Sequence, residues 1–220
     1  MNTNANPPMT LLIIGANGGI GSQTLKLALS RGHRVIAVVR NPANLLLTDT
    51  RLTVVKGNIF EPHAWKSYLS VADVVVSAIG KTSLKPTTLY SAGNRQLIRA
   101  MLASGCRRIF FISAAGIQVN STHPWILRVI TKQVLQRILK QTYRDLEVME
   151  TMIREYGAAL DWTILRPPRL VNRQNHRPYR YALNKQLDHC TTISRTDVAH
   201  FMLTHIFDEA TYRAIVEIAY

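Results

Sequence analysis

Residues 11–21 read Leu-Leu-Ile-Ile-Gly-Ala-Asn-Gly-Gly-Ile-Gly, and this stretch decides the fold. The four apolar residues at its start predict a short strand that is covered on both faces. A helical pattern follows over residues 19–31, so the glycines lie in the turn between strand and helix. Glycines at 15, 18 and 21 permit a tight turn, a close approach of phosphate to the backbone, and close packing of helix on strand. With the free N–H groups of the helix start, the turn predicts a dinucleotide pyrophosphate site. We assign that site to Gly15, Ala16, Asn17, Gly18, Gly19, Ile20 and Gly21.

The rest of the chain continues the alternation of strand and helix. Short apolar runs predict strands at residues 35–39, 52–55, 74–76, 109–112, 162–165 and 214–218. The segments between them predict helices at 61–69, 88–103, 124–156 and 196–207. Because such βαβ units connect parallel strands, we expect an α/β fold, a Rossmann doubly wound parallel sheet with helices on both faces. The basic and aromatic stretch 171–186 is interpreted as a loop or flap.

The residue that follows the second predicted strand distinguishes two dinucleotides. NAD sites usually carry Asp or Glu there to bind the ribose hydroxyls, whereas NADP sites use Arg to accommodate the 2′-phosphate. This sequence has Val38-Val39-Arg40-Asn41, and the nearest acidic residue downstream is Asp49. Arg40 therefore favours NADP (as NADPH) over NAD, the alternative being an ordinary surface arginine.

Length and composition favour one domain. A chain of 220 residues with 47% hydrophobic residues fits a single NAD(P)-binding Rossmann domain over 1–220, with a small substrate-side region at about 166–195. The first residues lack the pattern of a signal peptide, and no apolar run approaches the roughly 20 residues of a membrane span, so we expect a cytoplasmic protein. The two cysteines and seven histidines lack the spacing of metal ligands, so we expect no metal.

The positive charge is uneven. The formal net charge is +14; residues 74–144 hold eleven Lys or Arg and no acid, and residues 162–187 hold six and no acid. Such regions attract a phosphorylated cofactor, an anionic small-molecule substrate, nucleic acid or an anionic membrane surface, or they only keep the surface soluble. The amphipathic basic pattern at 125–143 predicts a helix with its charged face in water, over a substrate, or on a membrane. The sequence contains no RNA-binding aromatic motif that would favour nucleic acid.

Further motifs occur in a consistent order along the chain. They are Arg40-Asn41-Pro42, Gly57-Asn58-Ile59, Val76-Ser77-Ala78-Ile79-Gly80, Ile112-Ser113-Ala114-Ala115-Gly116, Asp161-Trp162-Thr163-Ile164-Leu165-Arg166-Pro167 and Ile193-Ser194-Arg195-Thr196-Asp197-Val198-Ala199. With the glycine turn, they make residues 10–220 resemble the atypical short-chain dehydrogenase/reductase group. Within it the chain is similar to NAD(P)H-binding proteins related to biliverdin reductase B/flavin reductase and to NmrA-like proteins.

The resemblance implies further cofactor contacts. It places Asn58 and Ile59 beside the adenine, where Asn58 replaces the commoner Asp but keeps a carbonyl acceptor. It places Ala78, Ile79 and Gly80 near the nicotinamide ribose, and it adds Ser113 and Pro167 at the ends of the fifth and sixth strands. Ser113 is also the candidate catalytic group, with a purely structural hydrogen bond as the alternative. Arg166 is a candidate to bind an anionic substrate or to brace the following loop, with a structural salt bridge as the alternative. Tyr179 is a second candidate substrate contact.

The Tyr-x-x-x-Lys dyad of standard short-chain dehydrogenases is absent. If Glu150 is the Glu that follows the Lys by four in extended members, Thr142 and Leu146 occupy the Tyr and Lys positions. Tyr143 lies one residue away, followed four residues later by Glu147. Tyr181 and Lys185 have the dyad spacing but follow the sixth strand, so we interpret them as coincidence.

Two functions fit these features. Hydride transfer needs no side-chain acid if the site positions the nicotinamide against an acceptor, so an NADPH-dependent reductase of a small conjugated acceptor, such as a flavin or quinone, is the leading hypothesis. A non-catalytic NADP-sensing regulator of NmrA-like type is the alternative. The sequence leaves the substrate, the proton donor and the oligomeric state open.

Overall fold

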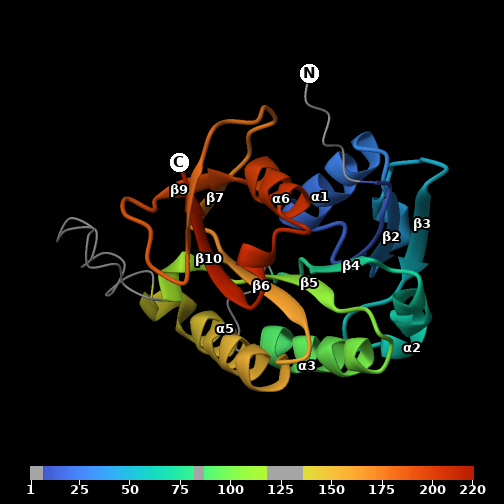
Figure 1. The fold of residues 1–220 in the computed structure, drawn as a ribbon, viewed down its shortest axis with the longest axis horizontal. Helices are drawn as coiled ribbons and strands as arrows, with labels where there is room; N and C mark the ends of the chain where they lie inside the picture. The colour runs from blue at the N-terminus through green and yellow to red at the C-terminus, as the bar shows by residue number, and fades with distance from the viewer. Residues whose placement is uncertain (1–6, 82–86, 118–135) are drawn as a thin grey trace.

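The computed structural model describes residues 7–81, 87–117 and 136–220. A central sheet separates two layers of helices (Figure 1). Helices α1 (Gly19–Ser30) and α6 (Arg195–Thr204) pack together on one face, and α3 (Leu89–Leu102) and α5 (Gln136–Tyr156) pack together on the other. A short helix α2 (Pro62–Trp65) continues into a 3-10 turn at Lys66–Ser70. No helix among the described residues is long and apolar enough to cross a membrane.

The main sheet has eight strands in the order β3-β2-β1-β4-β5-β6-β10-β8. All neighbouring pairs are parallel except β8 and β10. The chain runs outward from β1 through β2 to β3, then returns to place β4 on the other side of β1, and this reversal is where doubly wound sheets bind ligands. The expected doubly wound α/β fold is therefore confirmed. The strands are β1 (Thr10–Ile14), β2 (Arg34–Val39), β3 (Leu52–Lys56), β4 (Val74–Ser77), β5 (Arg108–Ile112), β6 (Asp161–Arg166), β8 (Arg180–Leu183) and β10 (Ala214–Ala219).

The interpretation of 171–186 as a loop was wrong for its central part. Residues Arg180–Leu183 form β8, which pairs antiparallel with β10 at the edge of the sheet. Only Ala182 of this strand is buried, so the apolar alternation that identifies a strand is missing from the sequence. A second, two-stranded parallel sheet joins β7 (Arg169–Val171) to β9 (Thr192–Ser194).

The structure describes one of the two long predicted helices in full and the other only in part. The helix predicted at 88–103 is present as α3. Of the helix predicted at 124–156, the part from residue 136 onward is α5, and the remainder lies outside the described residues. Most of the basic pattern at 125–143 therefore lies outside them as well.

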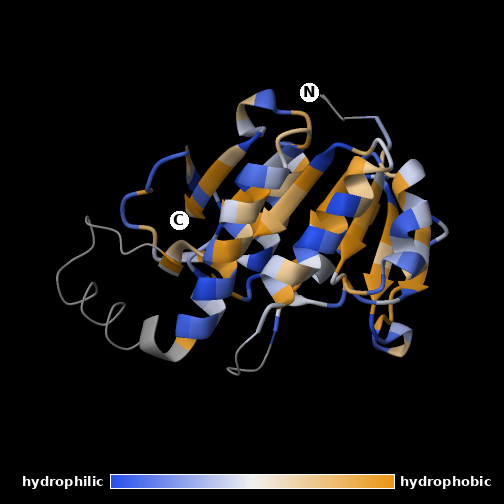
Figure 2. Cartoon of the chain, turned by 90° about the horizontal axis from the view of Figure 1, so that it is seen from below, coloured by the Kyte–Doolittle hydropathy of each residue, from blue (hydrophilic) through white to orange (hydrophobic). Residues whose placement is uncertain are grey.

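Apolar side chains fill both sides of the sheet. Figure 2 shows hydrophobic residues concentrated in the strands and on the inner sides of the helices. Adjacent residues of one strand point into opposite cores: Leu11 and Ile13 pack under α1 and α6, and Leu12 and Ile14 pack under α3 and α5. Both sides are buried, which explains why the strands read as continuous apolar runs.

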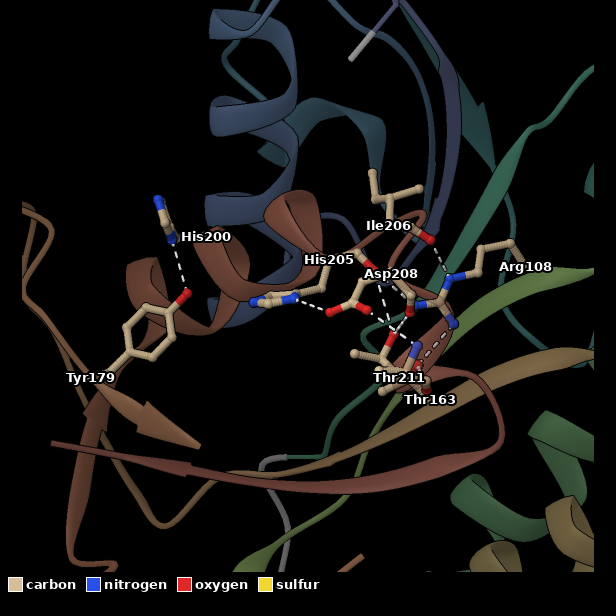
Figure 3. Close-up of polar contacts among 9 residues, drawn as sticks. Arg108, Thr163, Tyr179, His200, His205, Ile206, Asp208 and Thr211 are labelled. Atoms are coloured by element: carbon tan, nitrogen blue, oxygen red, sulfur yellow. Dashed lines mark hydrogen bonds and ion pairs between the residues drawn. The ribbon is translucent and has the colours of Figure 1, made fainter. Parts of the chain in front are cut away.

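A buried arginine connects the sheet to the loop that follows α6 (Figure 3). Arg108 on β5 is 5% exposed, and its guanidinium lies over the ring of Phe110 at 4.0 Å. Burial lowers its pKa to about 10 from the ordinary 12.5. Its N–H groups donate to carbonyls of Ile206, Asp161 and His205 and to hydroxyls of Thr163 and Thr211, at 2.7–3.1 Å. These bonds fix the end of α6 to the middle of the sheet.

Candidate functional site

A cleft of about 940 Å³ lies at the carboxyl ends of β1, β2, β4 and β5, where the strand order reverses. The glycine turn forms one wall, and residues of α5 form another. Strand ends at such a reversal leave the backbone N–H groups of the following turns exposed to a ligand. The location agrees with the site expected for a dinucleotide.

The glycine turn is too crowded for side chains. Gly15 has φ +87°, a conformation that L side chains rarely adopt, and a Cβ there would lie 2.6 Å from the carbonyl oxygen of Ala78. A Cβ on Gly21 would overlap the carbonyl of Gly15. The N–H of Gly18 donates to the carbonyl of Gly15 at 2.9 Å, which closes the turn. Helix α1 then begins at Gly19 with no acidic residue in its first turn. This glycine cradle and helix start fit a pyrophosphate group.

The other end of the turn adjoins β2. Arg40 is exposed directly after β2 and lines the cleft together with Asn44. The side-chain amide of Asn17 donates to the carbonyl of Asn41 at 3.2 Å, so the turn and the residues after β2 are held side by side. Asn58 lines the cleft, but its side-chain oxygen already accepts the N–H of Phe60 at 2.8 Å. Any adenine contact by that oxygen would use its second lone pair.

A buried polar group lies beneath the end of β5. The hydroxyl of Ser113 donates to Glu150 on α5 at 2.6 Å, and Arg166 on β6 forms a hydrogen-bonded ion pair with the same carboxylate at 2.5 Å. Burial is the largest single influence on the pKa of Arg166 and lowers it, but the hydrogen bond to Glu150 and the negative charges of Glu150, Glu217 and Glu147 together raise it by more, so the net shift is upward. All three side chains are buried. The arrangement holds the end of β5 against α5.

An apolar face of α5 closes the far end of the cleft. Leu139, Thr142, Tyr143 and Leu146 line it, together with Leu89 and Tyr90 of α3. Their spacing on α5 is that of one helix face. Asp145 anchors the start of α3 here, because its carboxylate accepts the backbone N–H groups of Tyr90 at 2.8 Å and Ser91 at 3.3 Å. This end of the cleft is therefore built from two helices that are fixed to one another.

Tyr143 lines the cleft, although its sequence position is one residue away from that of the tyrosine in the standard dyad. Its ring lies over Gly116, where an added Cβ would overlap the phenol oxygen. Burial raises the pKa of Tyr143 above its ordinary 10. Thr142 and Leu146, which the alignment on Glu150 places at the positions of the standard dyad, also line the cleft. Tyr181 and Lys185 do not line the cleft.

Most of the predicted cofactor residues lie along this one cleft. Those that line it are Gly15, Asn17, Gly18, Gly19, Ile20, Arg40, Asn58, Ile59, Ala78, Ile79, Gly80 and Ser113. Ala16, Gly21 and Pro167 do not line it. Neither do the two predicted substrate contacts: Arg166 is paired with Glu150, and the hydroxyl of Tyr179 bonds to His200 at 3.0 Å on the α6 side of the sheet (Figure 3).

Two charged cleft residues were not among the predicted site residues. Arg195, the first residue of α6, lies against Gly19, and Lys81 follows Gly80 at the rim. Arg195 belongs to the Ile193–Ala199 motif, so its position in that motif was the available signal. Lys81 carries no comparable sequence signal apart from following the fourth-strand motif.

Known proteins agree with this geometry. Residues 15–209 match the NAD(P)H-binding family. The photosystem II assembly factor Ycf39 of Synechocystis sp. is 27% identical over 146 residues, 64% of this chain and 44% of that protein. A short-chain dehydrogenase/reductase from Veillonella parvula, solved in complex with NADP, superposes with a TM-score of 0.75 at 20% identity, covering 96% of this chain and 94% of that one. An anaerobillin reductase from Escherichia coli O157:H7 superposes with a TM-score of 0.77 at 19% identity over 96% of each chain.

The extent of these matches differs between comparisons. The chain spans less than half the length of the curated relatives that it matches. The solved structures cover nearly the whole chain and share its fold. Because the family match includes the glycine turn, the reversal of strand order and α6, the chain belongs to the NAD(P)H-binding family of the atypical short-chain dehydrogenase/reductase group.

Proposed function

We propose that this protein is an NADPH-dependent reductase that transfers hydride to a small conjugated acceptor, such as a flavin or a quinone. The observation that carries the proposal is the single cleft, which joins the glycine turn and Arg40 at one end to an apolar face of α5 at the other. A bound nicotinamide cofactor supplies the hydride. The chain supplies binding, orientation and a site with few polar groups at the acceptor end.

Arg40 supports NADP rather than NAD. It is the charged residue at the end of β2, where a 2′-phosphate is accommodated in NADP sites. The relative from Veillonella parvula was solved with NADP, which fits the same preference. An NAD site would be expected to have a carboxylate in this position.

The shape and composition of the acceptor end favour a flat, apolar molecule. Leu89, Leu139 and Leu146 present aliphatic surface there, and Tyr90 and Tyr143 present aromatic surface. Lys81 at the rim and the net charge of +14 favour an acceptor with a negative group. A solved structure with this fold is that of an anaerobillin reductase, which supports a reductase role for this cleft.

The proton that accompanies the hydride has two sources in this cleft. One is solvent water, and the other is the hydroxyl of Tyr143, which lines the α5 wall. The hydroxyl of Ser113 donates its hydrogen to Glu150, so Ser113 is better placed to accept a hydrogen bond from a ligand than to donate a proton. Tyr143 is therefore the side chain that we assign to proton donation.

The test is to mix the purified protein with NADPH and a panel of flavins, quinones, linear tetrapyrroles and carbonyl compounds. We expect oxidation of NADPH, followed by its absorbance, with at least one conjugated acceptor and little with simple carbonyls. Binding of NADPH is measured separately by calorimetry. Tight binding without oxidation on any acceptor would reject the reductase proposal.

That outcome would support the second candidate, a protein that binds NADP(H) without turnover and acts through a protein partner. Two observations favour it. The hydroxyl of Ser113 is already bonded to Glu150, and the curated relative Ycf39 is an assembly factor. A sensor of this kind binds NADP and NADPH with different affinity and couples that difference to a partner.

A further inference from the structure

Arg195 lies directly on the glycine turn, although the two are far apart in sequence. It is the first residue of α6, and it lines the cleft with Asn17 and Gly18. A Cβ added to Gly19 would lie 2.7 Å from Cδ of Arg195 and would overlap Nε. Gly19 is therefore a glycine for a different reason from Gly15 and Gly21, whose added Cβ atoms would meet backbone. The space that a side chain would occupy at position 19 is taken by the stem of an arginine.

The guanidinium of Arg195 is held by a neutral group. Nη1 donates to the side-chain oxygen of Asn172 at 2.7 Å. Asn172 directly follows β7, and the neighbouring carbonyl of Arg173 accepts the hydroxyl of Thr196 at 2.7 Å. An amide orients the guanidinium without neutralising its charge. The segment after β7 thus fixes the direction of Arg195 and leaves the positive charge at the edge of the cleft.

The surroundings of this guanidinium favour an anion. The N-terminus of α1 adjoins it, carries the partial positive charge of a helix start, and has no acidic residue in its first turn. Arginine is well suited to phosphate because its fork of N–H groups matches two oxygens. The arginine and the helix N-terminus are two independent groups that favour an anion, and they adjoin one another in the cleft.

We infer that Arg195 binds the pyrophosphate of the dinucleotide from the α6 side, while the glycine turn binds it from the α1 side. The inference rests on the proposed cofactor site and adds to it a residue that the strand–turn–helix motif does not contain. It also separates two arginines by role. Arg40 recognises the 2′-phosphate, which NADPH has and NADH lacks, whereas Arg195 recognises a group that both share.

Calorimetric titration of four compounds tests the assignment: NADPH, NADH, ADP-ribose and 2′-AMP. The first three contain the pyrophosphate, and 2′-AMP contains adenine, ribose and the 2′-phosphate alone. We expect Arg195→Ala to weaken NADPH, NADH and ADP-ribose by about tenfold to a hundredfold, the range for one charge-assisted hydrogen bond. We expect the affinity for 2′-AMP to stay nearly unchanged, because 2′-AMP has no pyrophosphate for Arg195 to contact. The salt dependence of NADPH binding also decreases in the variant.

The matched control is Arg173→Ala. Arg173 is exposed, adjoins Asn172 in sequence and does not line the cleft. Because each variant replaces one arginine by alanine, Arg173→Ala and Arg195→Ala have the same net charge. A second approach leaves Arg195 in place: Gly19→Ala displaces its stem, and Asn172→Asp pairs its charge with a carboxylate. We expect both changes to lower the affinity for the three compounds that contain the pyrophosphate. Asn172→Asp should lower it more than Asn172→Ala does.

Each other result overturns the inference. If Arg195→Ala and Arg173→Ala bind NADPH and NADH equally well, Arg195 does not contact the pyrophosphate. If Arg195→Ala lowers the affinity for 2′-AMP as much as that for ADP-ribose, the arginine supports the shape of the site and does not contact the pyrophosphate. If the unchanged protein binds none of the four compounds, the proposed cofactor site fails together with this inference, and that failure is seen before any variant is made.

Discussion

The hydroxyl of Ser113 donates a hydrogen bond to Glu150 across 2.6 Å, which ties the end of β5 to α5 beneath the cleft. Glu150 is 2% exposed and is at the same time the ion-pair partner of Arg166. A carboxylate buried in this way must be satisfied by its partners, since it has lost its water. The link therefore contributes to stability, and the functional residues above it depend on that rigidity.

Replacing Glu150 tests this dependence. Glu150→Gln leaves the buried charge of Arg166 without its ion-pair partner, and breaking a buried pair typically costs about 3–5 kcal/mol. We expect a loss of unfolding free energy near the lower figure, because Glu217 adds a second negative charge near Arg166. Ser113→Ala, which removes one hydrogen bond, costs about 1 kcal/mol. Urea unfolding monitored by circular dichroism measures both losses. Equal, small losses for the two variants would show that the ion pair contributes little.

Arg40→Ala tests the preference for NADP. The variant loses about tenfold to a hundredfold in affinity for NADPH, since a charge-assisted hydrogen bond is worth about 1.5–3 kcal/mol. NADH has no 2′-phosphate, so its affinity hardly changes. Titration by calorimetry or by nicotinamide fluorescence provides both numbers. An equal loss for the two cofactors would mean that Arg40 supports the residues after β2 and does not recognise the phosphate.

Tyr143→Phe tests the proton donor. We expect kcat to decrease by at least about tenfold with the preferred acceptor, less than the full 10²–10⁴ of a general acid because water replaces part of the effect. Burial raises the pKa of Tyr143 above 10, so its hydroxyl stays protonated at neutral pH, and kcat stays flat from about pH 6 to about pH 9. Steady-state rates across that range provide the measurement.

Two further variants accompany Tyr143→Phe. Gly116→Ala places a methyl group where the phenol oxygen lies, so it displaces Tyr143 and lowers kcat in the same way. Thr142→Val, one residue away on the same wall, is the control and leaves kcat nearly unchanged. If Tyr143→Phe retains the full rate, the proton comes from water.

His200 gives the fold a predictable sensitivity to acid. Burial, His176 and Arg31 lower the pKa of His200 to about 4 from the ordinary 6.5. Its Nδ1 atom is hydrogen-bonded to the hydroxyl of Tyr179, which stays protonated because burial is the main cause that raises its pKa to about 12 (Figure 3). His200 is therefore neutral in the folded chain and becomes protonated in the unfolded chain below about pH 6.5.

The sign follows from this difference in proton binding. Below pH 6.5 the unfolded state binds a proton that the native state does not, so the unfolding free energy decreases as the pH falls toward 4. The neighbouring groups on the packed elements are His176, Tyr179, Arg31, Asp197 and His205. We expect His200→Gln to show a shallower decrease between about pH 6.5 and about pH 5, a window above the ordinary pKa of Asp197. Urea midpoints at several pH values measure the slope, and an unchanged slope would contradict the assignment.

Sequence reasoning succeeded where the chemistry is local. The turn at residues 15–21, the strands and the residues at the strand ends follow from glycine conformation and apolar periodicity, and most of the site residues predicted from them line one cleft. Thr142 and Leu146, which the alignment on Glu150 places at the Tyr and Lys positions, both line the cleft. Tyr143 lies on the same helix face as Thr142 and Leu146, because residues three or four positions apart share a face. Comparison with the Tyr-x-x-x-Lys spacing tests only fixed positions, so it did not identify Tyr143.

The remainder depends on contacts between distant segments. Arg195 reaches Gly19 only because α6 packs against α1, and neither segment shows this on its own. Sequence alone left open whether Arg166 binds an anion or forms a structural salt bridge, and its partner Glu150 is identified only by the packing of α5. β8 has one buried side chain and is held by backbone pairing to β10, so its sequence resembles that of a loop.

Arg108 imposes an order on how the sheet is completed during synthesis. It lies in the middle of the chain, but three of its five acceptors belong to residues 205–211. A nascent chain that has emerged only through β6 has the arginine and the strands around it, while those acceptors are still inside the ribosome. Burying the guanidinium without them is costly, so the centre of the sheet stays open to water until the segment after α6 arrives. A segment that emerges late, residues 205–211, thus allows water to leave the middle of the sheet.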